Sequence, residues 1–490
     1  MPDRSRRRWT PATAVACLIP LLLVACSTTT PSPVVLPATP ASFAHAQASA
    51  SASASTSPSA SGIQTVLDAL ADPALPGLLK AVEQSAPTLV QALARITQAR
   101  ARLGTAQAGS QPQASAFAQG TRSNNSASTG GGTSAGGNPG ATTGNTPAYD
   151  LATAGLSLSW EIDLFGRLAA GRSAAQARLD AADADAQMTR LALRSQVADT
   201  LVVYRACMLA ASSQRDSLAA SLVTLHLTEV RQGAGLAPMI DVSRAQTSTG
   251  EVRTSLVATE GQCEQALQSL AYLSDQSVGT LRAQLQVSAN APASQLLELP
   301  ALHPAQPASV IARHPQVLRA QRNADAAWQD LGALRASRYP SLNLAATLAT
   351  TLIQLGPFQQ SFNSWSFGPS LSVALFDGGR IRASIEEGQG RYEESVAVLA
   401  GAVRDTVRDV ELALIQGQTA EAAAAQASAT LQASRQLYNA SEAAQRAGRL
   451  SLFELESARL SLLGAQTNLI NAHRDQARAW VALQKAAGVP

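Results

Sequence analysis

Few side chains in this sequence have the types and spacing that chemistry requires. The chain contains 490 residues, of which five are histidines and four are cysteines. The histidines form no cluster with the spacing of metal ligands: His45, His226, His303, His314 and His473. The sequence also has no nucleophile elbow and no serine motif with a lysine partner. We therefore expect no enzyme activity, no metal and no cofactor. The cysteines are the remaining reactive groups.

Cys26 follows a segment that is typical of a bacterial lipoprotein signal peptide. Residues 4–8 are rich in arginine, residues 14–25 are mostly apolar, and the small residue Ala25 directly precedes Cys26. The apolar run is too short to span a bilayer as a permanent helix, which favours a cleaved signal over residues 1–25. Cleavage would leave Cys26 as the lipid-bearing first residue. An ordinary secretory signal with an incidental cysteine is the alternative.

The residues after the signal contain little that could form a core. Residues 26–61 are largely Ser, Ala, Thr and Pro, so we expect a disordered tether between the lipid and the fold. Ser27 stands next to Cys26, and no aspartate is present there to signal retention in the inner membrane. We therefore expect a protein anchored by lipid in the cell outer membrane.

Cys207 and Cys263 lie at matched positions on either side of Gly235. Each is 28 residues from that glycine. In an antiparallel helical hairpin that turns at Gly235 the two cysteines would stand at the same height, so a disulfide is feasible if their side chains face each other. Export from the cytoplasm would favour the oxidised form. Two buried, reduced cysteines are the alternative.

The sequence contains a duplication. An unbroken offset of 213 residues relates Leu158–Arg167 to Leu371–Arg380 and carries Gly235 onto Gly448. Upstream, an offset of 228 residues relates Pro87 to Pro315, Leu103-Gly104 to Leu331-Gly332, and Pro112 to Pro340. The fifteen extra residues fall in a Gly/Ser/Thr/Asn-rich stretch at 120–146. We expect this stretch to be a loop between strands.

Each repeat is predicted to run helix, strand, strand, long helix, tight turn and returning helix, in a fold that is mainly α with a β part. The first repeat spans 62–276, with strands at about 111–120 and 151–165 and long helices at about 167–232 and 239–275. A Pro/Ala-rich linker at 277–312 joins it to the second repeat at 313–490. The second repeat has strands at about 340–350 and 365–377 and long helices at about 380–446 and 451–486.

The predicted strands alternate apolar and polar residues. In the second strand Leu156, Leu158 and Trp160 alternate with small polar residues, which is the period-2 pattern of a sheet with one apolar face. Four strands leave two open edges, which cannot face hydrocarbon, and about eight strands make the smallest closed barrel. Several copies would therefore share one barrel in a membrane. A soluble sandwich with one wet face is the alternative.

The long helices are predicted to pack side by side as staves. Residues 380–446 contain no proline, and apolar side chains recur every eleven residues at Ile381, Tyr392, Val403 and Leu414. An eleven-residue repeat keeps the packing seam nearly parallel to the helix axis. In the first repeat Leu168, Leu179 and Leu201 occupy the equivalent frame, but Arg190 interrupts it.

The lipoprotein signal, the duplicated strand-to-helix unit and the paired glycine turns together resemble the TolC-like outer membrane efflux protein family, over about residues 63–488. The resemblance implies a homotrimer with a 12-stranded β-barrel that continues as a periplasmic α-helical barrel. It also implies a passive exit channel for an inner-membrane pump of the resistance-nodulation-division type. The hairpin tips would contact a periplasmic adaptor protein: Gly235, Leu236 and Ala237 in the first repeat, Gly448, Arg449 and Leu450 in the second.

The same resemblance assigns a gate to two acidic residues that the duplication relates. Asp241 and Glu454 correspond to the acidic residues that lie near the periplasmic constriction of the tunnel. A second interpretation is available for both residues. Each lies in the first turn of a returning helix, where the helix dipole favours an acidic side chain.

Two other classes of function compete with the efflux channel. The outer-membrane duct of a type I protein secretion system is the alternative within the channel class, and a periplasmic coiled-coil scaffold lipoprotein is the alternative outside it. Nucleic acid is not an expected partner, because the formal charge of +3 disappears once the arginine-rich residues 1–25 are removed.

Overall fold

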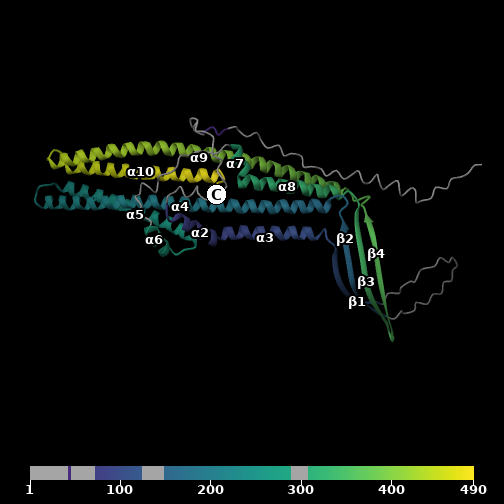
Figure 1. The fold of residues 1–490 in the computed structure, drawn as a ribbon. Coiled ribbons are helices and arrows are strands. Elements are labelled where there is room, and N and C mark those ends of the chain that lie inside the picture. The colour runs from purple at the N-terminus through teal and green to yellow at the C-terminus, as the bar shows by residue number, and fades with distance from the viewer. Residues whose placement is uncertain (1–41, 46–71, 124–147, 288–306, 490) are drawn as a thin grey trace, which may run out of the picture. The chain divides into compact units, whose positions relative to one another are not determined.

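The computed structural model describes residues 42–45, 72–123, 148–287 and 307–489. Four strands and eight of the helices make up the two repeats, with α6 between them (Figure 1). The first repeat contains α2 (Leu75–Ser85), α3 (Pro87–Ala108), β1 (Gln113–Ser123), β2 (Tyr149–Ile162), α4 (Arg167–Gly233) and α5 (Met239–Ser274). After α6 (Val278–Val287), the second contains α7 (Pro307–Arg313), α8 (Pro315–Ala336), β3 (Ser341–Leu355), β4 (Phe358–Ser372), α9 (Arg380–Arg446) and α10 (Leu452–Ala486).

The chain divides into two compact units that do not follow the division into repeats. Unit 1 comprises the described residues of Gln98–Leu179 and Arg322–Val396, so it holds the four strands and the helix ends next to them. Unit 2 comprises the described residues of Leu36–Thr97, Asp180–Gln321 and Ala397–Pro490. Each unit therefore draws on both repeats, because the long helices of each repeat pass through both units.

Unit 1 contains one antiparallel sheet with the strand order β1-β2-β3-β4 (Figure 1). The central pair, β2 with β3, joins the two repeats, with Gly155 opposite Ala349. A Cβ atom at position 155 would lie 2.4 Å from the carbonyl oxygen of Leu348, so only glycine allows the two strands to approach this closely. Strands β1 and β4 form the two edges of the described sheet.

The strand boundaries differ most from the sequence prediction at β4. This strand was expected at about 365–377, but it begins at Phe358 and ends at Ser372. It begins earlier because β3 and β4 form a hairpin around Gly356, at φ 56°, and the pairing continues through polar residues that the apolar alternation does not reveal. It ends earlier because its partner β3 begins at Ser341, which lies opposite Ser372. Asp377, within the predicted strand, instead accepts hydrogen bonds from the N–H groups of Gly379 and Ile381 at the start of α9.

The other strands differ by a few residues from their predicted positions. Strand β1 was expected at 111–120 and lies at Gln113–Ser123. Strand β2 was expected at 151–165 and lies at Tyr149–Ile162. Asp163 lies beyond this strand and accepts a hydrogen bond from the N–H of Ala169 in the first turn of α4. Strand β3, expected at 340–350, extends to Leu355 because its hairpin partner continues with it.

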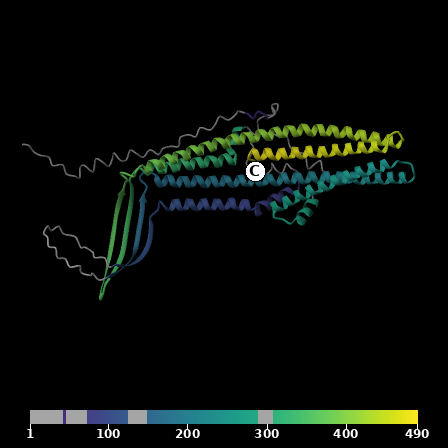
Figure 2. The ribbon, with the colours of Figure 1, turned by 180° about the vertical axis from the view of Figure 1, so that it is seen from behind.

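Two long helical hairpins, α4 with α5 and α9 with α10, form much of unit 2 (Figure 2). Helices α4 and α9 contain 67 residues each, which corresponds to about 100 Å at 1.5 Å per residue. Within the eleven-residue frame, Val403 and Leu414 are buried, whereas Arg190 is exposed. Helix α4, in which Arg190 interrupts the eleven-residue repeat, therefore exposes this arginine to its surroundings.

The core of unit 2 gathers residues from α2, α3, α4, α5, α6 and α10. Trp480 on α10 is 2% exposed, and Leu267 and Leu270 on α5 are each 1% exposed in the same cluster. Helix α6 lies in the segment that was predicted to join the two repeats, and its Leu281 and Leu285 are buried in this core. The part of the predicted inter-repeat linker (277–312) at 278–287 is therefore helical. Residues 288–306 lie outside the described structure.

One ion pair is buried beside this core. The guanidinium of Arg205 on α4 donates to both carboxylate oxygens of Asp72, at 2.8 and 3.2 Å, and to the carbonyl of Leu285 at 2.8 Å. Both side chains of the pair are 7% exposed. Because a buried guanidinium needs partners for its N–H groups, Arg205 holds the start of α2 and the end of α6 against α4.

Residues 42–45 contradict part of the predicted tether. Phe43 is 4% exposed and packs with Val410 and Leu414 of α9. The carboxylate of Glu411 accepts hydrogen bonds from the backbone N–H groups of Ala44 and His45 and is 2.8 Å from the His45 ring. The composition of 26–61 concealed this contact because one aromatic side chain is enough to anchor a segment otherwise poor in apolar residues.

Three further expectations fall outside the described residues. These are the signal peptide at 1–25, Cys26 with most of the tether, and most of the glycine-rich stretch at 120–146. Only residues 120–123 of that stretch are described, and they form the end of β1.

Candidate functional site

The sheet of unit 1 has an unusual distribution of exposure. On β2, Leu156 and Leu158 are 60% and 38% exposed, whereas the polar residue Ser157 between them is half-buried. On β4, Trp365 and Phe367 are 79% and 65% exposed. The sheet therefore exposes an apolar face to its surroundings. This pattern is typical of strands that contact lipid.

The polar face of the sheet is held together by cross-strand hydrogen bonds. Ser115 and Ser157 are 2.8 Å apart on β1 and β2, and the hydroxyls of Thr153 and Thr351 are 3.4 Å apart on β2 and β3. Small hydroxyl side chains on this face leave room on one side of the sheet. If the sheet is closed into a barrel, this face becomes the lining of an aqueous lumen.

The two hairpins end in the same backbone turn. Gly235 and Gly448 both have φ 70°, a conformation that glycine adopts without strain. In each turn the residue after the glycine donates to a carbonyl five residues earlier: Leu236 to Arg231 at 2.8 Å, and Arg449 to Ala444 at 2.9 Å. This is the Schellman arrangement of a helix C-terminus, so both tips turn tightly for the same reason.

Asp241 and Glu454 occupy equivalent positions but have different partners. Glu454 completes a capping box, because its carboxylate accepts from the N–H and the hydroxyl of Ser451 while its own N–H donates to that hydroxyl. These hydrogen bonds lower the pKa of Glu454. Asp241 follows Pro238, which offers no side-chain cap, and lies 3.7 Å from Arg244. Asp241 is therefore less constrained by its own helix end than Glu454 is.

A groove of about 520 Å³ separates the two hairpin ends. Among the predicted tip and gate residues, Leu236, Ala237, Asp241, Gly448 and Leu450 line it, while Gly235, Arg449 and Glu454 do not. The ends are held together across the groove, because the guanidinium of Arg244 on α5 lies 5.0 Å from the centre of the Phe453 ring on α10. Both views place the two ends side by side (Figures 1 and 2).

Sequence reasoning missed a buried charged cluster at this groove, whose lining includes Thr224 and Glu456. Oε1 of Glu456 accepts from Arg459 at 2.6 Å and from the hydroxyl of Thr224 on α4 at 2.7 Å. Arg459 also lies 3.4 Å from the hydroxyl of Tyr438 on α9. Glu456 is 8% exposed, and its other oxygen has no hydrogen-bond partner. The duplication concealed this cluster, because the residues at the equivalent positions in the first repeat are Ser243 and Gln246.

The packing face of α4 changes from apolar to polar toward the tip. Before Cys207 its buried residues include Val197, Leu201 and Val202. After Cys207 five buried polar residues follow at alternating spacings of three and four: Gln214, Ser217, Ser221, Thr224 and Thr228. The hydroxyls of Ser217 and Ser221 have no hydrogen-bond partner. Because hydroxyl groups contribute little apolar burial, this end of the hairpin is held less firmly than its base.

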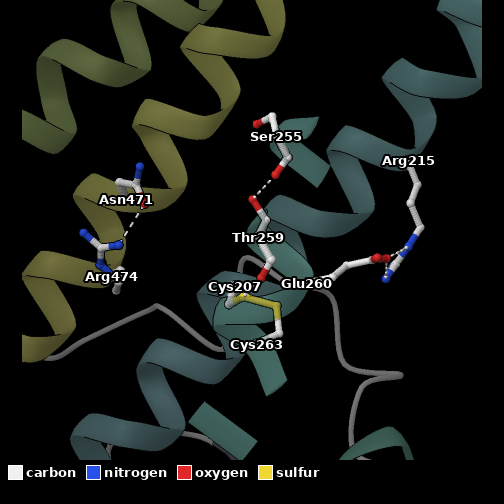
Figure 3. The surroundings of a disulfide bond; sticks show 8 residues. All are labelled: Cys207, Arg215, Ser255, Thr259, Glu260, Cys263, Asn471 and Arg474. Atoms are coloured by element: carbon white, nitrogen blue, oxygen red, sulfur yellow. Dashed lines mark hydrogen bonds and ion pairs between the residues drawn. A yellow bond between two sulfur atoms is a disulfide. The ribbon is translucent and has the colours of Figure 1, made fainter. Parts of the chain in front are cut away.

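A disulfide joins Cys207 and Cys263 near the point where the packing changes, with their Cα atoms 5.5 Å apart (Figure 3). Arg215 donates to Glu260 at 2.7 Å one to two turns closer to the tip and also links α4 with α5. The disulfide therefore joins the two helices of the hairpin, α4 and α5, at the border between its apolar base and its polar end.

Two features are absent from the described residues, a metal-binding cluster and a membrane-spanning helix. Within these residues no three His, Cys, Asp or Glu side chains gather in a way that could hold a metal ion. None of the described helices has both the length and the apolar character needed to cross a membrane.

Reduction of the Cys207–Cys263 bond is expected to lower the free energy of unfolding by about 2–4 kcal/mol, because a bridge that spans 56 residues restricts the unfolded chain. Urea unfolding followed by circular dichroism, with and without a thiol reductant, measures this difference. The double variant Cys207→Ser, Cys263→Ser should be insensitive to the reductant. Equal midpoints for the wild-type protein in both conditions would show that the bridge does not form.

Replacement of Glu456 by Gln should loosen the contact between the hairpins, because it leaves the Arg459 charge without its carboxylate. We expect a loss of about 2–3 kcal/mol, below the value for a fully buried pair, because Arg459 is partly exposed and glutamine can still accept from Thr224. Faster hydrogen exchange near 221–228 and 455–460 measures the effect. The matched control Glu454→Gln keeps a capping side chain and should change exchange little. An equal effect of both substitutions would contradict the assigned role of Glu456.

The comparisons with known proteins agree with these features. The model of the outer membrane efflux protein family matches residues 78–274 and 307–489. The outer membrane protein OprJ of Pseudomonas aeruginosa is 29% identical over 269 residues, which are 54% of this chain and 55% of OprJ, so the match spans about half the length of that relative. The pyoverdine export outer membrane protein OpmQ of the same organism is 28% identical over 432 residues, or 88% of each chain.

A solved structure shares the fold. The crystal structure of the CmeC outer membrane channel of Campylobacter jejuni superposes with a TM-score of 0.76, covers 92% of this chain and 93% of CmeC, and is 16% identical in sequence. At this identity the likeness concerns the fold alone. The family match is broader, because its two ranges cover well over half of the sequence and include both hairpins. This chain belongs to the outer membrane efflux protein family.

Proposed function

We propose that this chain is the outer-membrane channel subunit of a tripartite efflux pump, through which substrates leave passively. The observation that carries the proposal is the sheet of unit 1, whose large apolar side chains, such as Trp365 and Phe367, are exposed. Such a face is costly in water and favourable in lipid. The opposite face, with its serine and threonine side chains, suits a polar lumen.

The sheet cannot serve as a channel in a single copy. Its order β1-β2-β3-β4 leaves the N–H and C=O groups at the outer edges of β1 and β4 without strand partners in the described chain. Hydrocarbon does not tolerate such edges, and four strands are too few to close. Three copies would supply the 12 strands that the family resemblance implies, and the long helices of three copies would continue the tunnel into the periplasm.

The hairpin tips are the proposed contact surface for a periplasmic adaptor and, through it, an inner-membrane pump. Three large apolar side chains are exposed beside the first tip: Leu236 at 71%, Met239 at 61% and Ile240 at 55%. Phe453 is 56% exposed beside the second. Apolar groups that are exposed together at the end of two hairpins favour contact with another protein.

The gate assignment is retained for Asp241 and becomes less direct for Glu454. Asp241 lines the groove and has only a long contact to Arg244, so its charge can act on groups in the tunnel. Glu454 is committed to the capping box of α10, which supports the helix-end interpretation. We propose that Glu454 contributes to the gate mainly by fixing the first turn of α10.

Lipid attachment at Cys26 remains part of the proposal and rests on the signal sequence. The family match favours a channel over a periplasmic coiled-coil scaffold. The sheet supports the same choice, because a scaffold needs no sheet with an exposed apolar face. A type I secretion duct would share that sheet, and the match to the outer membrane efflux protein family favours efflux over it. The two can be separated by which inner-membrane transporter pulls down with the detergent-solubilised protein.

Two neighbouring residues on opposite faces of β4 test the channel directly. Phe367→Arg places a charge on the lipid face at a cost of about 2–4 kcal/mol near the bilayer midplane, so the amount of protein assembled in the outer membrane should fall. Ser366→Arg places the same charge on the polar face. It should leave assembly intact and shift the ion selectivity of the pore toward anions.

The measurements are membrane fractionation and the conductance of purified protein in a planar bilayer. The wild-type protein should form oligomers and conduct ions. A strictly monomeric protein that passes no ions would refute the channel, and so would equal losses of assembly in the two variants.

A further inference from the structure

The duplication places two equivalent apolar sites in unit 2. The first apolar site consists of buried residues of the first repeat: Val82 on α2, Val197 and Leu201 on α4, and Leu270 on α5. At the two offsets of the duplication their repeats are also buried together and define the second apolar site: Val310 on α7, Val410 and Leu414 on α9, and Leu483 on α10. Every member of one site is therefore an apolar residue in the other. The two sites differ in the segment that fills them.

Helix α6 fills the first apolar site. Its Leu281 and Leu285 are buried in the same cluster, and α6 contacts α5 (Figures 1 and 2). The guanidinium of Arg205 on α4 donates to the carbonyl of Leu285 at 2.8 Å. The added segment is thus held by apolar burial and by one hydrogen bond from a side chain of α4 to its backbone.

Residues 42–45 fill the second apolar site in the same manner. Phe43 is buried in it, and the segment lies beside α9, in purple in Figure 1. The side-chain amide of Gln418 on α9 donates to the carbonyl of His45 at 2.7 Å. Gln418 is the repeat of Arg205, so both repeats use the same helix position to hold the backbone of the added segment. Residues 42–45 therefore take the place in the second repeat that α6 takes in the first.

Glu411 adapts the second apolar site to a segment that is not helical. Its carboxylate accepts from the backbone N–H groups of Ala44 and His45 at 2.6 and 3.1 Å. Its repeat in the first site is Ala198, which is fully buried. The N–H groups inside a helix are paired with its own carbonyls, whereas residues 42–45 form neither helix nor strand and need another acceptor. The carboxylate is thus present in the repeat whose added segment requires it.

The two segments are not held equally firmly. Helix α6 buries two leucines, and the buried Arg205–Asp72 pair lies beside its end. Residues 42–45 bury one large apolar side chain, Phe43, and the His45 side chain that faces Glu411 is 47% exposed. Because apolar burial provides most of the driving force for such contacts, residues 42–45 are the more easily released of the two segments.

The two hairpins also differ in their covalent links. The disulfide Cys207–Cys263 joins α4 to α5 close to the first apolar site. The repeats of these cysteines are Ala420 on α9 and Gln476 on α10, so the second hairpin has no bridge at the equivalent place. The base of the α9–α10 hairpin therefore depends more strongly on the segment that fills its apolar site.

We propose that the second apolar site is a reversible docking site for the N-terminal segment of this chain, and that docking holds the base of the α9–α10 hairpin. The segment that fits is short and non-helical, with one aromatic side chain followed by two backbone N–H groups that face Glu411. Docking goes beyond the proposed channel function and does not depend on it. One consequence rests on the proposed lipid attachment at Cys26: the end of the chain that carries the lipid is joined to α9.

A cysteine placed in the second apolar site reports whether Phe43 is docked. Ala413→Cys puts a thiol at a position that is 3% exposed in the cluster with Phe43. In the full-length protein its reaction with a maleimide, followed by mass spectrometry of the labelled peptide, should be slow. Adding Phe43→Ala should accelerate the reaction about tenfold or more, because a buried aromatic ring no longer covers the site. Slow labelling in both proteins would overturn docking through Phe43.

The first apolar site supplies the matched control. Ala198→Cys is also buried, and its labelling should not respond to Phe43→Ala. Leu285→Ala on α6 should have the reverse effect, with faster labelling at position 198 and no change at position 413. Equal acceleration at both positions by Phe43→Ala would show a general loosening of the unit and would overturn the proposal.

A peptide added to the protein tests whether docking is reversible. A synthetic peptide of residues 38–49, at about 1 mM, should slow the labelling of position 413 in the Phe43→Ala protein, because a short flexible tether provides an effective concentration of that order. The same peptide with alanine in place of Phe43 should not protect. Protection by neither peptide, or equal protection by both, would contradict reversible docking.

Glu411→Ala gives the second apolar site the residue that the first site has. It should accelerate labelling at position 413, because the N–H groups of Ala44 and His45 lose their acceptor. Glu421→Ala removes an exposed carboxylate from the same helix and should have no effect. Equal labelling rates in these two variants would count against the assigned role of Glu411.

Hydrogen exchange tests the effect on the hairpin. Phe43→Ala should speed exchange at 407–418 and 479–486 and leave the equivalent residues 194–205 and 266–273 unchanged. Unchanged exchange in α9 and α10 would refute the effect on the hairpin. Cys26→Ser removes the proposed lipid but should leave labelling at position 413 slow. Conductance is measured separately, so failure of the channel or of lipid attachment is distinguishable from failure of docking.

Discussion

The constraint on which the rest of this structure depends is the pair of unsatisfied strand edges in unit 1. Backbone N–H and C=O groups need partners, and in lipid no water supplies them. In the proposed channel, a four-stranded sheet with an exposed apolar face therefore cannot be the finished state. The apolar face favours a membrane, and the open edges would be met by further copies of the sheet. Neither property alone would point to a shared barrel, because an exposed apolar face also occurs at ordinary protein interfaces.

The duplication provides the means to meet this constraint. One junction between repeats, β2 with β3, lies inside the chain, and in the proposed channel a second junction would lie between copies. Gly155 is crowded at the first junction, whereas its repeat, Gly368, has open space around it. In that channel a duplicated subunit would build a ring from two nearly equivalent contacts. The repeats need not remain identical, however, and the exposed Leu375-Phe376 corner differs from its counterpart at Phe165 in both spacing and exposure.

Unit 2 addresses a different requirement. Near its core, apolar side chains around Trp480 and the buried Arg205–Asp72 pair hold six helices together. Beyond the Cys207–Cys263 bridge the packing face of α4 becomes polar, and the two hairpins are joined through charged and hydroxyl groups such as Glu456 and Thr224. Hydrogen bonds and ion pairs depend on geometry more than apolar contacts do. If the polar contact between the two hairpins breaks and the hairpins rearrange, less buried apolar area is lost than at an apolar contact. A firm base with a polar end suits the proposed channel, whose hairpin tips would have to part for substrates to pass.

The sequence by itself determined the order of elements, the long helices and the matched glycine turns, because period-2 and helical patterns, glycine and proline act locally. It also placed Cys207 and Cys263 at the same height, since that depends only on counting along two helices. Tertiary structure decided what depends on partners distant in the chain: that Phe43 is buried, that residues 278–287 form a core helix, and where β4 ends. It also decided that Glu454 serves a helix cap while Glu456 joins the two hairpins. Both residues lie in the first turns of one helix, and local sequence cannot distinguish them because their roles are set by the neighbour each one faces.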